Sequence, residues 1–487
     1  MTNAPVIHWF RRDLRLTDNL ALAAAAQSGL PVLPVFILDP ALVNSRRVGL
    51  PRLAFMLKGL AALDMALRAQ GSRLWLGYGD PRLLMPALVQ LSGAQALFYN
   101  RDYSPLALRR DQAAVDSLTI PVHSFDDALL LPPGSVMTES GKPFTVFTPF
   151  KRKWLTLPKQ TMADPVPTGA YVDAATVDTL RLQTADGREL PLQAIPSLAD
   201  LGLSAAIPVP AASEAEAARR LDDFLNQRVY HYAEGRNGMH GTVTDDTLGG
   251  WSFLSPYLRM GMLSPRQAYW GARHAYTATG QNQARESVET WVSELVWREF
   301  YMHILYHFPH VAAGSFRPQY DRLAWRYAPD ELAAWKEGMT GFPVVDAAMR
   351  QLKTMGWMPN RARMIVASFL AKDLLIDWRE GERHFMDWLI DGDPAANNGG
   401  WQWSAGTGTD AQPYFRIFNP ASQSEKFDPE GTYIRRWVPE LRAVPTRFIH
   451  APWENPPAPQ GYPPPIVDRT LARERTLAAF KAVGDNR

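Results

Sequence analysis

VIHWF (6–10) is the first of five short apolar runs in the opening 130 residues, and VLPVFIL (32–38), RLWLG (73–77), ALFYN (96–100) and IPVHSF (120–125) follow it. These runs are rich in β-branched and aromatic residues and are bounded by polar or turn residues, which is typical of buried strands. Longer amphipathic runs, typical of helices, lie between them, for example at 53–70 and 106–118. Strict alternation of strand and helix predicts an α/β domain with a doubly wound parallel sheet.

The turn after the first strand excludes one common use of this fold. A dinucleotide-binding enzyme carries a glycine-rich fingerprint at this turn, because glycines let the backbone approach the pyrophosphate. The sequence here is RRDLRLTDN (11–19), which contains no glycine. Whatever the domain binds is therefore not held by a glycine-rich phosphate turn.

The rest of the chain changes character twice. From about 156 to 212 it is rich in proline, alanine, aspartate and threonine without sustained periodicity, which predicts a long connector. After Ser213, which precedes acidic residues and so resembles a helix N-cap, the pattern is helical, and no convincing strand follows. We therefore expect an α/β domain at 4–133, an interdomain connector at 134–212 and an all-α domain at 213–487.

Composition narrows the functional classes. The 487 residues are 46% hydrophobic and 21% charged, which is globular and too long for one ordinary core. The chain has no cysteine, which excludes disulfides, thiolate metal sites and a cysteine nucleophile, and we expect no metal. The net charge of +2 means that any nucleic-acid binding needs a local basic patch. The sequence has no run of about twenty apolar residues and no signal-peptide pattern, which predicts a soluble, cytoplasmic protein without membrane association.

Tryptophan is distributed unevenly. Of 16 tryptophans, only Trp9 and Trp75 precede residue 150, and 13 lie from Trp251 onward. Each alone is best read as bulky core filler, but the asymmetry indicates that the two halves do different work.

The window WVSELVWREF (291–300) places a carboxylate between indoles. At helical spacing Trp291, Glu294 and Arg298 fall within about 60° of one another, with Trp297 a further 60° or so round the helix. The simpler interpretation, which this window alone favours, is a surface ion pair between Glu294 and Arg298. In the alternative, the indoles stack on flat rings while Glu294 binds a base edge.

Two later windows are also dense in binding groups. Asn360, Arg361 and Arg363 begin a helix, where cationic side chains oppose the helix dipole, so they need an external anion or nearby acids such as Asp373 or Asp377 as partners. The window DGDPAANNGGWQWSAGTGTD (391–410) makes a poor helix and a poor strand, which predicts a loop kept for what it touches.

These windows, together with several others, resemble the cryptochrome/photolyase family, most closely its class I cyclobutane pyrimidine dimer photolyases. The motifs that carry the resemblance are WFRRDLRLTDN (from Trp9), VFTPFKRKW (Val146), LSPYLRMGMLSPRQ (Leu254), ELVWREFY (Glu294), FPVVDAAMRQL (Phe342), WMPNRARM (Trp357), and DLLIDWREGERHF with DGDPAANNGGWQW and GTDAQPYFRIFNP (373–420). They span nearly the whole chain. The resemblance implies an α/β domain followed by an all-helical domain that binds FAD.

The resemblance also implies roles for individual residues around the cofactor. It places the FAD phosphates at Tyr232, Ser252, Leu254, Ser255 and Arg298, with Trp291 also at the cofactor. It places the ribose and isoalloxazine at Asp391 and Asp393, pairs Arg363 with Asp391, and sets Asn397 at the flavin N5. The sequence departs from the family where Trp-Ser-Phe-Leu-Ser (251–255) replaces Thr-Ser-Arg-Leu-Ser, and where the stretch after Arg236 is longer than usual.

The activity implied is light-driven repair, in which excited reduced FAD gives an electron to a pyrimidine dimer flipped out of DNA. The resemblance assigns Glu294, Trp297, Asn360 and Met364 to the lesion pocket, with Asn397 beside the flavin. It assigns Trp401, Trp378 and Trp325 to an electron-transfer chain. Contacts with DNA are implied for Arg236, Glu294, Trp297, Asn360, Arg361, Trp403, Arg416, Gln423 and Lys426.

Several alternatives stay open. Leu106 and Ala107 stand where folate-binding members carry an Asn-Glu pair, so a deazaflavin is favoured over folate as an antenna chromophore, and another flavin or no antenna follow. A cryptochrome-type light sensor would share the fold and cofactor, but sensors often replace Asn397 with an acid and commonly carry a long C-terminal extension. A (6-4) photoproduct photolyase would carry a histidine at Met364. We expect a monomer whose partner is DNA containing pyrimidine dimers.

Overall fold

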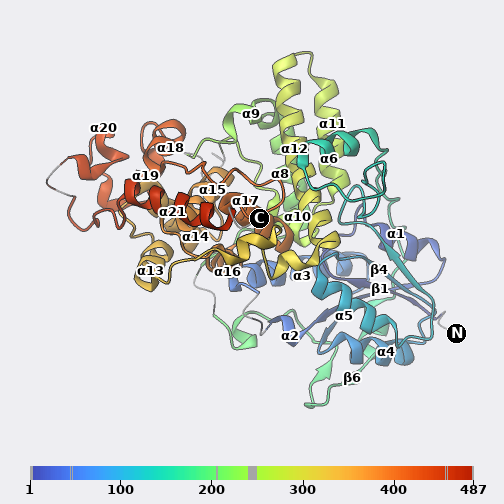
Figure 1. Ribbon diagram of the computed structural model, residues 1–487. Coiled ribbons are helices and arrows are strands. Elements are labelled where there is room, and N and C mark those ends of the chain that lie inside the picture. Colours follow the sequence, from blue (N-terminus) through green and yellow to red (C-terminus); the bar gives the residue numbers. More distant parts are fainter. Residues whose placement is uncertain are drawn as a thin grey trace.

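A computed structural model describes residues 4–43, 45, 48–204, 207–239, 249–455, 457 and 459–484. Its first part is a five-stranded parallel sheet with strand order β3-β2-β1-β4-β5, shown in blue to cyan in Figure 1. The strands are β1 (Val6–Phe10), β2 (Val32–Leu38), β3 (Trp75–Tyr78), β4 (Leu97–Asn100) and β5 (Val122–Phe125). The order reverses at β1, as in doubly wound sheets, and the predicted α/β class is confirmed.

Helices cover both faces of this sheet. They are α1 (Leu20–Gln27), α2 (Pro40–Val43), α3 (Leu50–Ala69), α4 (Pro81–Ser92) and α5 (Pro105–Val115). Because side chains alternate along a strand, Phe36 of β2 joins the same core as α1 and α3, while Val35 and Ile37 join the core of α4 and α5. The first of these cores continues into the second half of the chain, through Trp291 and Leu295.

The connector contains more regular structure than its sequence suggests. Its elements are α6 (Phe147–Thr156), α7 (Ala174–Thr179), the antiparallel pair β6 (Leu182–Gln183) and β7 (Glu189–Leu190), and a 3-10 turn η1 (Ala199–Leu201). Part of it packs against the sheet: the Val172 amide donates to the Val32 carbonyl at 2.9 Å, and Leu190 is fully buried. These elements are too short to leave a periodic pattern, so periodicity could not predict them.

The remainder is helical, and no strand follows Leu190 within the described ranges. Its elements are α8 (Glu214–Asn226), η2 (Arg228–His231), α9 (Tyr232–Gly235), α10 (Ser255–Met260), α11 (Pro265–Ala278), α12 (Asn282–His307), η3 (Pro309–Ala312), η4 (Pro318–Arg322), α13 (Pro329–Glu337), α14 (Pro343–Met355), α15 (Asn360–Ser368), the π-helix η5 (Phe369–Asp373), α16 (Trp378–Trp388), α17 (Pro394–Ala405), α18 (Pro420–Phe427), α19 (Thr432–Trp437), η6 (Pro439–Leu441), α20 (Thr446–Ile449), η7 (Pro452–Glu454) and α21 (Arg469–Gly484). In Figure 1 they form the green-to-red part of the molecule beside the sheet. None of the described helices is long and apolar enough to cross a membrane.

Local signals in the sequence explain where two of these helices begin. Ser213 is the N-cap of α8, because its side chain accepts a hydrogen bond from the Glu216 amide, as predicted. Helix α15 begins at Asn360, directly after Pro359, again as predicted.

The expectation of a loop at 391–410 is wrong for most of its length, because Pro394–Ala405 forms helix α17. Asp393 caps this helix by accepting hydrogen bonds from the Ala395 and Ala396 amides, and Pro394 occupies the first helical position. Gly406, in the left-handed conformation, ends it. Strong end signals therefore outweigh the weak helix propensity of the Asn-Asn-Gly-Gly sequence within it.

Candidate functional site

A cavity of about 490 Å³ lies within the helical part of the chain. Its walls come from α9, the segment 251–259, α12, α15, the turn 389–393 and α17. A volume of this size is typical of sites that enclose a cofactor. It brings together side chains that are more than 160 residues apart in the sequence.

Most of the residues singled out in the sequence line this one cavity. From the cofactor set these are Tyr232, Ser252, Leu254, Ser255, Trp291, Arg298, Arg363, Asp391, Asp393 and Asn397, and from the lesion set Glu294, Trp297, Asn360 and Met364, together with Arg236, Trp401 and Trp403. Arg361, Arg416, Gln423, Lys426, Trp378 and Trp325 do not line it. Residues 240–248, which contain most of the long stretch after Arg236, lie outside the described residues.

Two aspartates shape one wall of the cavity. Asp391 forms the expected ion pair with Arg363, Oδ2 to Nη2 at 2.8 Å, and also accepts a hydrogen bond from Ser255 Oγ at 2.6 Å. Burial alone would raise the pKa of Asp393, but Arg12 and Arg259 more than offset it and hold this pKa below its ordinary value. Both carboxylates are held in place before any ligand binds, which suits groups that accept hydrogen bonds from a flat, polar cofactor.

Two further side chains in the cavity suit an anion or a polar ring. Arg298 is fixed by a hydrogen bond from Nη1 to the Ala128 carbonyl at 2.8 Å, and burial lowers its pKa. Asn397 donates through Nδ2 to the Glu382 carbonyl at 3.0 Å, which leaves its side-chain oxygen as the acceptor for a ligand N–H. Cationic donors, hydroxyls, carboxylates and an amide in one cavity fit the phosphates, ribose and ring of FAD.

Glu294 does not pair with Arg298, so the simpler interpretation of this window is wrong. Its carboxylate lies 2.6 Å from Arg236 Nη1, on the turn after α9. Burial raises the pKa of Glu294, although Arg236 opposes the change. Because Asn360 and Met364 line the same cavity, the carboxylate borders a space that a second molecule could enter.

The three tryptophans of the expected electron chain lie on three elements. Trp401 of α17 and Trp378 of α16 are almost fully buried, while Trp325 after η4 is half-buried. Their indole nitrogens are buried and have no hydrogen-bond partner within the described part of the chain. Sequence reasoning missed Trp335, whose ring centroid lies 6.0 Å from that of Trp401.

Two basic residues converge outside the cavity. Arg361 of α15 and Lys426 of α18 both lie over the ring of Phe427, at 4.3 and 5.5 Å from its centroid. Arg361 also donates to the Asn237 side chain at 2.8 Å, so it does not use Asp373 or Asp377, whose ion-pair partners are Arg469 and Arg379. This placement leaves two cations available to phosphates at the surface.

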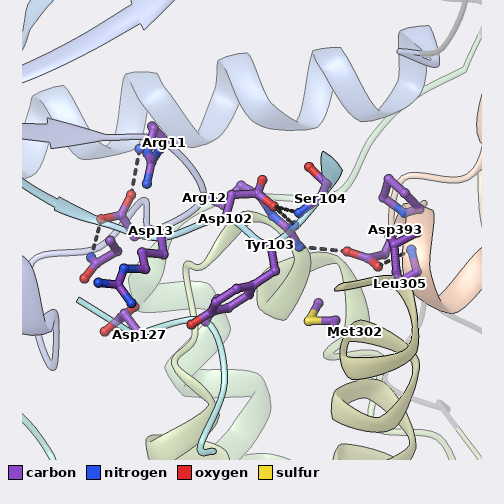
Figure 2. Close-up of a pocket in the computed structure, with 15 residues that line it drawn as sticks. Arg11, Arg12, Asp13, Asp102, Tyr103, Ser104, Asp127, Met302, Leu305 and Asp393 are labelled. Carbon is purple, nitrogen blue, oxygen red and sulfur yellow. Dashed lines mark hydrogen bonds and ion pairs between the residues drawn. The ribbon is translucent and has the colours of Figure 1, made fainter. Parts of the chain in front are cut away.

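A second, small cavity lies where the sheet meets the helical part (Figure 2). Arg12, which follows β1, forms ion pairs with Asp102 at 3.3 Å and with Asp393 at 2.8 Å, and so connects the two parts. The cavity measures about 20 Å³, room for about one water molecule and not for a tricyclic chromophore. The favoured deazaflavin antenna stays a prediction.

Comparisons with known proteins point the same way. A family profile described as DNA photolyase matches residues 6–170, and one described as the FAD binding domain of DNA photolyase matches residues 291–482. The chain is 41% identical to the deoxyribodipyrimidine photo-lyase of Synechococcus sp. over 482 residues, covering 98% of this chain and 96% of the relative. Its structure is similar to a class III photolyase from Agrobacterium tumefaciens (TM-score 0.86, 37% identity, 100% and 99% covered) and to a Synechocystis cryptochrome (TM-score 0.84, 28% identity, 98% and 99% covered).

Proposed function

Because this chain belongs to the DNA photolyase family, we propose that its large cavity carries out the light-driven repair of cyclobutane pyrimidine dimers in DNA. The observation that carries the proposal is that one cavity is lined by both the cofactor set and the lesion set of residues. The chain binds FAD, which supplies an electron to the dimer under light and receives it back after the ring opens. The site is complete within one chain, so we propose that the protein acts as a monomer, and we place it in the cytoplasm because a cysteine-free chain suits a reducing compartment.

We assign the FAD phosphates to Arg298 and to the segment that contains Ser252, Leu254 and Ser255, with Tyr232 and Trp291 closing that end of the cavity. Hydroxyls and a guanidinium donate hydrogen bonds, and a phosphate needs donors. The residues proposed for the ribose and isoalloxazine are Asp391, Asp393, Arg363 and Asn397. Asp391 pairs with Arg363, and Asp393 pairs with Arg12. Each ion pair fixes its carboxylate, so that cofactor binding requires little further ordering of these side chains.

Glu294 and Asn360 are the polar residues that we propose for the lesion bases. A hydrogen bond to a base carbonyl becomes stronger when negative charge develops on that carbonyl, so a donor there stabilises the electron-accepting state of the dimer. Asn360 donates through its amide, and Glu294, whose pKa is raised by burial, donates when it is protonated. Trp297 and Trp403 supply flat surfaces for stacking, and Met364 supplies an adaptable apolar contact. Arg236 pairs with Glu294 in this structure, and we propose that it contacts a DNA phosphate when DNA binds.

The remaining assignments concern electrons and DNA. We propose that Trp401, Trp378 and Trp325 carry electrons from the surface to the cavity when the flavin is oxidised. We assign the DNA backbone to Arg236, Arg361, Arg416, Gln423 and Lys426, which we propose as the local patch that a chain of net charge +2 needs. The Arg416 carbonyl accepts a hydrogen bond from Nζ of the buried Lys372 at 2.8 Å, and this bond anchors the loop that contains Arg416.

The proposal is tested by cofactor content and by repair. The purified protein is expected to carry one non-covalent FAD per chain and to split thymine dimers in an oligonucleotide under blue light, but not in the dark. Absorbance spectroscopy and chromatography of the oligonucleotide give the two readouts. A protein that cannot be reconstituted with FAD would contradict the assignment, and one that binds FAD yet repairs only (6-4) photoproducts, or no lesion, would favour the alternatives.

Arg361→Ala and Lys426→Ala are expected to weaken DNA binding several-fold without changing the repair yield of bound lesion. Each removes one phosphate contact, so the slope of log affinity against log salt should become shallower by about 0.9 for duplex DNA. Binding titrations at four salt concentrations measure this slope. Lys142→Ala, at an exposed lysine of the connector, is the control, and an unchanged slope in both test variants would remove these residues from the interface.

A further inference from the structure

Phe147 of the connector lies flat against Trp297. Their ring centroids are 3.5 Å apart and their planes differ by 5°, a fully stacked pair. Trp297 lines the large cavity and Phe147 does not. Phe147 therefore covers one face of the Trp297 indole, and only the rest of the indole borders the space proposed for the lesion.

The rest of α6 packs along α12, the helix that carries Trp297. Phe150 contacts Phe300 with ring centroids 5.2 Å apart, and Lys151 Nζ donates to Ser293 Oγ at 2.6 Å. One turn later, Trp154 Nε1 donates to the buried Glu299 carboxylate at 2.6 Å. Positions 147, 150, 151 and 154 form one face of a helix, so α6 acts as a brace along α12.

The first residue of the brace is also tied to the loop that follows α17. The Phe147 amide donates to Asp410 Oδ2 at 3.0 Å, and Thr409 Oγ1 donates to the Thr145 carbonyl. Asp410 belongs to the loop that follows α17, the helix carrying Trp403. Phe147 therefore connects the two segments that present the indoles of the lesion pocket.

We propose that Phe147 is a positioning residue for lesion recognition, which fixes the plane of Trp297 before DNA binds. An indole that is already stacked on one side loses little rotational freedom when a pyrimidine stacks on it, so more of the stacking energy appears as affinity. The contribution is specific to a flipped-out base, because phosphate contacts do not involve Trp297. This inference rests on the proposed function and adds a residue that acts through Trp297.

The test uses the FAD-loaded full chain in the dark, with dimer-containing and undamaged oligonucleotides of one sequence. Phe147→Leu keeps an apolar side chain but removes the flat ring, and Phe147→Tyr restores the ring. Phe150→Leu is the matched control, because it makes the same change on the same helix at a ring that packs on Phe300. FAD absorbance and thermal midpoints establish that each variant is folded.

Phe147→Leu is expected to lower the preference for dimer-containing DNA about three- to tenfold, the range expected for one aromatic stack. Affinity for undamaged DNA should stay unchanged, and Phe147→Tyr and Phe150→Leu should keep the wild-type preference. A folded Phe147→Leu variant with undiminished preference, or an equal loss in Phe150→Leu, would overturn the inference while leaving the proposed function standing. A wild-type protein without any preference for the dimer would overturn both.

Discussion

Trp401→Phe is expected to slow the light-driven reduction of oxidised FAD at least about tenfold, while enzyme that has been reduced chemically still repairs dimers. Trp401 lines the cavity, is 2% exposed and packs tightly on α16, where a Cβ added at Gly381 would lie 2.0 Å from its ring. Phenylalanine fills most of this space but is much harder to oxidise than tryptophan. The rate of photoreduction should fall to roughly a tenth or less, which corresponds to a barrier raised by about 1.4 kcal/mol or more.

The measurement is flavin absorbance during illumination with an external reductant. Trp335→Phe is the informative control, since Trp335 is equally buried and contacts Trp401 edge to face but does not line the cavity. If Trp335→Phe lost photoreduction and Trp401→Phe kept it, the electron would enter by a different route. Equal repair by all pre-reduced variants would show that the substitutions leave the lesion pocket intact.

Glu294→Gln is expected to lower the repair yield per absorbed photon by roughly tenfold, about 1.4 kcal/mol of stabilisation of the charged state. The substitution keeps the size of the side chain, but it replaces the carboxyl O–H with an amide N–H, a weaker donor to the charged base carbonyl. FAD content should not change. The yield is measured under blue light with enzyme in excess over a thymine-dimer oligonucleotide, so that weaker binding cannot lower it.

The ion pair with Arg236 makes a second variant necessary. If Glu294 served only to hold Arg236, then Arg236→Gln would reduce the yield as much as Glu294→Gln does. We expect Arg236→Gln to weaken DNA binding instead, because its guanidinium is assigned to phosphate. Glu289→Gln, on an exposed position of the same helix, controls for the loss of a negative charge.

Sequence patterns predicted the sheet because β1 to β4 are mostly buried runs between polar boundaries, whereas β5 has no buried residue. β1 and β2 have no exposed residue, so apart from His8 their sequences are continuously apolar and stand out without any alignment. The start of α8 was equally readable, because an N-cap depends on a few adjacent residues. The expected site residues came from motif resemblance, and the structure brings most of them into one cavity.

What the sequence could not show are contacts between distant segments. Helical spacing allowed a pair between Glu294 and Arg298, but Arg236, 58 positions earlier in the chain, takes that role. The stack of Phe147 on Trp297 likewise joins residues 150 positions apart. In the window 391–410, helix-breaking residues concealed α17, because its stability comes from its caps and its packing against α16.

The ion pairs of Arg12 limit how this protein can be recombined with its relatives. A chimera that takes its α/β domain from one parent and its helical domain from another inherits Arg12 and Asp393 from different ancestors. If the donor lacks an arginine at this position, the buried Asp393 at the start of α17 keeps Arg259 at 3.6 Å but loses its nearest cation, at a cost of at most about 3–5 kcal/mol. Parents for domain exchange should therefore be chosen so that both carry Arg12, Asp102 and Asp393.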